Sequence, residues 1–94
     1  MNKLQIQASA IITPVGISGA ITMNTLIGRV NIPASTSSIT VTNNLVYATS
    51  LIFASILTND TTATIKNIVP TAGAFTINLT ANTTAETKIA FYIP

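Results

Sequence analysis

The sequence predicts an all-β protein, and more specifically a small antiparallel β-sandwich of jelly-roll-like form. First, Ile, Val and Thr supply 37 of the 94 residues, and these β-branched side chains suit a pleated strand better than a helix. Second, apolar and polar residues alternate along several short segments, which is the period of a half-buried strand. Third, clusters of Pro, Gly, Asn and Asp separate these segments, as in sandwiches and barrels built from short strands.

Residues 1–25 are expected to differ from the rest of the chain. Residues 5–10 alternate between polar and apolar types, but Pro14 and two glycines interrupt any regular element after them. Two interpretations remain open. The segment is either an extra strand over residues 3–12 followed by a loop, or an extended arm that docks onto neighbouring molecules, and we favour the strand.

Residues 26–94 are expected to form the sandwich domain. Val30 and Ile32 share one face of its first strand. Apolar residues occupy every second position in two later segments, residues 75–81 and residues 89–93. A less regular strand before them is expected to bulge near Asn67. The expected strands are 26–32, 38–42, 45–57, 63–69, 75–81 and 87–93.

The segment 45–57 is apolar on both of its alternate faces, unlike the other expected strands. The second sheet of a sandwich covers only one face of a strand, so we expect a neighbouring subunit to cover the other. The alternative is that this strand crosses between sheets within one subunit. Its 13 residues fall short of the roughly 20 that a membrane-spanning helix needs, so no membrane insertion is expected. The candidate subunit-interface residues are Val46, Ile52, Ala54 and Ile56.

The turns between the expected strands indicate a polar recognition end. In an antiparallel meander alternate turns lie at the same end, which would group turns 33–38, 58–62 and 82–86 and place turns 43–44 and 70–74 opposite them. Polar loops on a rigid sheet often carry recognition, although turns are also polar for purely structural reasons. The candidate receptor-contact residues at this end are Ser37, Asn59, Asp60, Thr61, Asn82, Thr83 and Glu86.

Composition excludes most kinds of chemistry. Without Cys or His, the chain has no disulfide, no thiolate or imidazole metal site, and no nucleophile activated by His. The two carboxylates, Asp60 and Glu86, could together hydrolyse a glycoside or hold a cation between subunits. However, their neighbours offer no apolar pocket and no calcium-loop spacing, so we expect no enzyme, metal or cofactor. The four basic residues are scattered, and nucleic acid is not an expected partner.

Five segments resemble parts of a known family. They are Gly28–Ile32, Ile39–Val41, Asn44–Ala54, Phe75–Leu79 and Lys88–Ile93. Together, over roughly residues 27–94, they resemble the small β-sandwich modules at the ends of bacteriophage tail fibres, tailspikes and head fibres. The resemblance implies a homotrimeric virion structural protein, either a fibre, a spike or a capsid-decoration component. It carries over no functional residue, because these modules have no fixed binding motif.

The partners and location follow from this interpretation. We expect the protein to associate with itself and with other virion proteins, and a host-surface glycan is a further candidate partner in host attachment. The chain shows no signal peptide, so synthesis in the host cytoplasm and location in the virion are expected. The alternative function is a carbohydrate-binding or adhesin module that is not associated with a virion.

Overall fold

The computed structural model describes residues 11–12, 19–58 and 62–94. In this part of the chain all regular elements are strands and there is no helix. The strands are β1 (Ile11–Ile12), β2 (Ile21–Thr22), β3 (Ile27–Ile32), β4 (Ser38–Thr42), β5 (Phe53–Ile56), β6 (Ile65–Thr71), β7 (Ala74–Leu79) and β8 (Thr87–Tyr92). Of the expected strand over residues 3–12, only β1 lies within the described residues.

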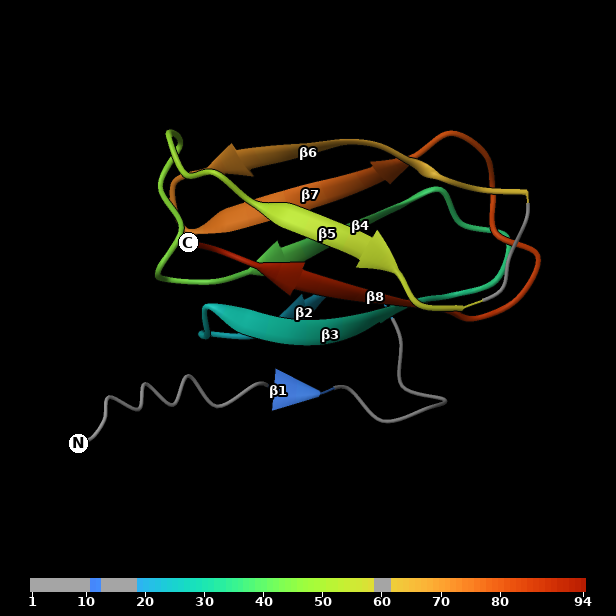
Figure 1. Cartoon of the computed structure of the whole chain (residues 1–94), viewed down its shortest axis with the longest axis horizontal. Coiled ribbons are helices and arrows are strands. Elements are labelled where there is room, and N and C mark those ends of the chain that lie inside the picture. Colours follow the sequence, from blue (N-terminus) through green and yellow to red (C-terminus); the bar gives the residue numbers. More distant parts are fainter. Residues whose placement is uncertain (1–10, 13–18, 59–61) are drawn as a thin grey trace.

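The strands form two four-stranded sheets that pack face to face (Figure 1). The order is β1-β3-β8-β5 in the first sheet, named sheet A here, and β2-β4-β7-β6 in the second, named sheet B. Strands β3 to β8 pair with one another in antiparallel fashion, whereas β1 runs parallel to β3 and β2 runs parallel to β4. The prediction of an all-β chain with two packed sheets is therefore confirmed, although the sheets are mixed.

The meander assumed for the order of the strands is wrong. Only β6 and β7 are neighbours in both the sequence and a sheet, and every other connection between described strands crosses to the opposite sheet. Crossing lets every strand turn its apolar face toward one shared core, which a single meandering sheet cannot do. Because each crossing still reverses the chain direction, alternate loops lie at the same end, as the meander also required.

The core lies between the sheets and is built from the alternating positions that the sequence indicated. Phe75 of sheet B and Phe91 of sheet A meet edge to face, with their ring centroids 5.0 Å apart and their planes at 64°. Gly28 of β3 lies beside this pair, because a Cβ atom there would be 2.7 Å from the Phe91 ring. The main buried apolar strand residues are Val30, Ile32, Ile39, Val41, Phe75, Ile77, Leu79, Ile89 and Phe91.

The bulge expected near Asn67 is present. The register between β6 and β7 shifts between Ile65 and Asn67, so β6 contains one residue more than its partner over this stretch. The shift aligns Asn67 with Asn78 of β7, whose Nδ2 donates a hydrogen bond of 2.8 Å to Asn67 Oδ1.

The largest difference between the expected and the observed strands lies in residues 45–57. Only β5 is a strand, and residues 43–52 form a connection with two turns. Asn43 is fully buried; its Nδ2 donates to the Thr25 carbonyl oxygen at 2.7 Å, and its Oδ1 accepts from the Leu45 N–H at 3.0 Å. The Tyr47 N–H donates to Ser50 Oγ. The bonds of Asn43 to Leu45 and of Tyr47 to Ser50 are local and compete with strand pairing, which explains why the strand begins only at Phe53.

Candidate functional site

The outer face of sheet A carries exposed aromatic side chains. Phe53 of β5 is 59% exposed and Tyr92 of β8 is 50% exposed. The strand register pairs Ile27 with Tyr92 and Tyr92 with Phe53, which places the three side chains in one row across the sheet. Two more exposed apolar residues, Leu51 and Leu57, flank β5. We call this surface the apolar face.

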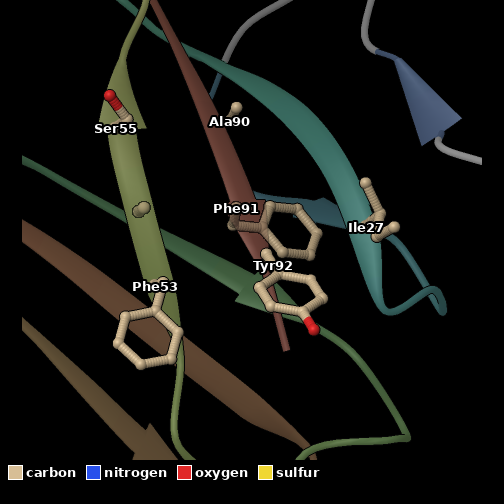
Figure 2. Close-up of a pocket in the computed structure, with 7 residues that line it drawn as sticks. Ile27, Phe53, Ser55, Ala90, Phe91 and Tyr92 are labelled. Carbon is tan, nitrogen blue, oxygen red and sulfur yellow. The ribbon is translucent and has the colours of Figure 1, made fainter. Parts of the chain in front are cut away.

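A shallow depression lies on the apolar face between the two aromatic rings (Figure 2). Its volume is about 330 Å³. The small side chains of Ser55 and Ala90 leave this space beside the rings of Phe53 and Tyr92. Among the described residues that line it, the only side-chain polar groups are the Ser55 and Tyr92 hydroxyls. A sugar or an ion needs several polar partners when it loses water, so the depression suits an apolar side chain.

The candidate subunit-interface residues point toward the core of their own subunit, and the assignment of Val46, which is fully buried there, is wrong. Strand β5 pairs with β8 so that Ala54 lies opposite Phe91 and Ile56 opposite Ile89. Because Phe91 and Ile89 point into the core, the even-numbered residues of β5 also point inward, and the odd-numbered residues carry the exposed face. The four even-numbered candidates are covered by their own subunit, Val46 completely and the others in part: Val46, Ile52, Ala54 and Ile56.

The polar loops meet at one end, as expected. The Ser35 N–H donates to the Thr83 carbonyl oxygen at 2.8 Å, which joins the β3–β4 and β7–β8 connections. The Lys88 N–H donates to Thr58 Oγ1 at 2.7 Å, which brings the start of the β5–β6 connection to the same end. Three of the candidate contact residues, Asn59, Asp60 and Thr61, lie outside the described residues, so a pairing of Asp60 with Glu86 stays a hypothesis.

Thr83 is wrongly assigned to receptor contact. Its side chain is only 3% exposed. Its Oγ1 donates to the Pro33 carbonyl oxygen at 2.6 Å, and its N–H donates to the Thr36 carbonyl oxygen at 3.0 Å. Thr83 therefore fastens two loops together. The three other described candidates at this end remain accessible, with Ser37 and Asn82 exposed and Glu86 partly so.

The outer face of sheet B is polar, in contrast to the apolar face. Thr40 Oγ1 and Thr76 Oγ1 of adjacent strands lie 3.0 Å apart in a hydrogen bond. Thr64 Oγ1 and Thr80 Oγ1 repeat this contact at 3.1 Å. The hydroxyls thus satisfy one another across the strands without using charged groups. The two outer faces of the sandwich differ in character, and only sheet A presents exposed aromatic rings.

Neither a metal site nor a membrane span is found among the described residues. No three acidic, His or Cys side chains gather there into a possible metal-binding group. No helix within the same residues is long and apolar enough to cross a membrane.

The comparisons with known proteins identify no relative. The chain matches no family model, no curated protein and no solved structure.

Proposed function

We propose that this protein is a structural module of a bacteriophage virion that acts by assembling with copies of itself. In this proposal it forms a homotrimer and serves as a fibre, spike or capsid-decoration component with a jelly-roll fold. The observation that supports it is the apolar face, which lies exposed on a chain with only 6% charged residues.

Exposure of these rings favours association energetically. A contiguous apolar surface on a small subunit is typical of an interaction site. Burying the exposed half of one aromatic ring removes roughly 100 Å² from water, which contributes about 2–3 kcal/mol. With so few charges, the chain also lacks the usual surface repulsion that keeps small domains monomeric. Self-association would bury the exposed apolar surface, and the small number of charges would not oppose it.

The strand order supports the jelly-roll part of the proposal. Strands β3, β8 and β5 lie next to one another in sheet A, and β4, β7 and β6 do so in sheet B, with connections that cross between the sheets. Crossed connections of this Greek-key kind are found in two-sheet jelly rolls, which include viral capsid domains. The trimeric state and the virion location rest on the resemblance over residues 27–94.

The rival function is a carbohydrate-binding or adhesin module without a virion. The depression on the apolar face does not favour it, because that wall offers two hydroxyls and no charged group to a sugar. A host-surface glycan would fit better at the polar end, around Ser37, Asn82 and Glu86. Glycan-array binding that Ser37→Ala and Asn82→Ala abolish would support this role of the polar end.

Two measurements test the proposal. Sedimentation equilibrium should give about three times the subunit mass of 9.8 kDa. Electron microscopy of phage particles with a gold-labelled antibody against the chain should show label on the particle. A monomer at all accessible concentrations would refute the assembly function, and glycan binding by a protein absent from particles would favour the rival.

A further inference from the structure

We infer that the exposed edge of β5 accepts the N-terminal segment of a neighbouring copy, residues 3–10, as an additional strand of sheet A. This inference rests on the proposed self-association. It assigns the contact between two copies to the β5 edge of one and to residues 3–10 of the other. The edge of a strand in one subunit would then pair with a segment of another subunit whose sequence alternates like a strand.

The edge of β5 has backbone groups that sheet A does not use. Strand β5 pairs only with β8 and ends the sheet. The Leu57 N–H donates to the Lys88 carbonyl oxygen at 2.8 Å, so by antiparallel alternation Phe53, Ser55 and Leu57 direct their backbone groups toward β8. Ala54 and Ile56 direct theirs to the opposite side, where no described strand lies.

The sheet edges formed by β2 and β6 carry features that discourage pairing, and the edge formed by β5 does not. Proteins protect edges with very short strands, bulges, Lys and Pro. Strand β2 has only two residues, and β6 combines Lys66, Pro70 and the bulge between Ile65 and Asn67. Strand β5 has the sequence Phe-Ala-Ser-Ile, without charge, Pro or bulge. Of these three edges in the described part of the chain, the one formed by β5 is open to pairing.

The same edge leaves the rim of the core incompletely covered. The side chains of Ala54 and Ile56 point inward but are only partly buried, as are those of Ile65 and Ile68 on β6. Strands β5 and β6 contact each other along this side of the sandwich. A strand added beside β5 would place its apolar side chains over this rim and its polar side chains on the outer face.

The N-terminal segment has the pattern that such a strand requires. Polar and apolar residues alternate strictly through Lys3, Leu4, Gln5, Ile6, Gln7, Ala8, Ser9 and Ala10. Strand β1 directly follows it and pairs Ile11 with Gly28, whereas β3 begins at Ile27. In this parallel register β3 can therefore pair with only one residue before Ile11. No strand residue in the described part of sheet A lies opposite the rest of the segment, and we place its partner in a second copy.

Deletion of residues 2–9 tests the inference and separates it from the proposed function. Sedimentation equilibrium should show at least a tenfold weaker association for the deletion variant than for the full chain, while the variant keeps a cooperative thermal unfolding transition. Equal association of both proteins would overturn the inference and leave self-association standing. A monomeric full chain would overturn both proposals.

Amide hydrogen exchange gives a second readout that does not depend on the deletion's stability. In the assembled full chain the Ala54 and Ile56 amides should exchange at least tenfold more slowly than in the deletion variant. The Ser55 amide, which faces β8, is the internal control and should be slow in both. Equal rates for Ala54 in the two proteins would contradict the added strand.

Disulfide cross-linking identifies the segment that lies beside β5. The chain has no Cys of its own, so only the introduced cysteines can react. Protein carrying Gln5→Cys or Gln7→Cys is mixed with protein carrying Ser55→Cys and oxidised. Because Ser55 is exposed on the outer side of β5, a mixed disulfide dimer should form. Thr40→Cys, exposed on sheet B, is the matched control and should give at least tenfold less. Equal yields with Ser55→Cys and Thr40→Cys would refute the pairing, as would capture of a different virion protein on β5 in place of the segment.

Discussion

Replacing Phe53 by Ser tests whether the apolar face drives association. The side chain is 59% exposed, and an aromatic residue has roughly 200 Å² of surface that can be buried. About 120 Å² is therefore free for a partner, which at about 25 cal/mol per Å² corresponds to roughly 3 kcal/mol. Since about 1.4 kcal/mol changes an equilibrium constant tenfold, Phe53→Ser should raise the dissociation constant by roughly 100-fold.

Phe53→Ser should lower the free energy of unfolding of the subunit by less than it weakens the association between subunits. Only about 80 Å² of the Phe53 side chain is buried within the subunit, so Phe53→Ser should lower the free energy of unfolding by at most about 2 kcal/mol. Sedimentation equilibrium measures the association. Urea unfolding measures the stability, and it must be done at dilutions where the protein is monomeric, because association itself adds apparent stability.

Val69→Ser is the matched control for this experiment. Val69 is 45% exposed and lies opposite Thr76 on the outer face of sheet B. The substitution removes an exposed apolar side chain from the other face and should change the dissociation constant by no more than about twofold. Equal weakening by Phe53→Ser and Val69→Ser, or no weakening by Phe53→Ser, would refute the assignment of the interface to sheet A.

Three further substitutions test internal contacts by urea unfolding. Gly28→Ala should lower the free energy of unfolding by about 1–3 kcal/mol, because the new methyl group would lie 2.7 Å from the Phe91 ring; wild-type stability would show that β3 can move away. Thr83→Val should lower it by about 1–2 kcal/mol through loss of the 2.6 Å bond to the Pro33 carbonyl oxygen, and no change would contradict the fastening role. Asn43→Ala should lower it by about 2–3 kcal/mol, because it removes two bonds from a buried turn; a loss below half of this would show that water replaces the amide.

Alternation predicted the core well where one face is apolar and the other polar. In β7, Phe75, Ile77 and Leu79 are all buried, and Thr76 lies on the opposite face. Such a strand has only one favourable orientation, because a shift by one residue would expose every apolar side chain. Local sequence is then sufficient to decide which residues enter the core.

The same argument fails for β5. Phe53 and Ile56 are both apolar and belong to opposite faces, so hydrophobicity alone does not decide which of them points inward. Pairing with β8 decides it, and that pairing is a contact between segments far apart in the sequence. Of the candidate interface residues, Val46 is buried within the subunit, whereas Ile52, Ala54 and Ile56 lie on the inward face and are only partly buried.

Side-chain hydrogen bonds between residues far apart in the chain could likewise not be predicted from the sequence. Thr83 has the same chemistry as the exposed threonines of sheet B, yet it is buried because its hydroxyl reaches Pro33, 50 residues earlier in the chain. Asn43 was recognised as a turn residue, but its bond to Thr25 was not anticipated. Neither burial could follow from composition, since hydroxyl and amide groups enter a core only where a partner meets them.

The amino-acid sequence by itself determined that this chain is all-β, that its core is built from alternating positions, and that it carries more apolar surface than one small sandwich needs. These properties follow from side-chain shape, hydrophobic period and composition, which act locally. Only the tertiary structure decided the strand partners, the exposed face of β5 and the open edge beside it. Those features depend on which distant segments meet, because a strand's neighbours, and not its own residues, determine which of two apolar faces is covered.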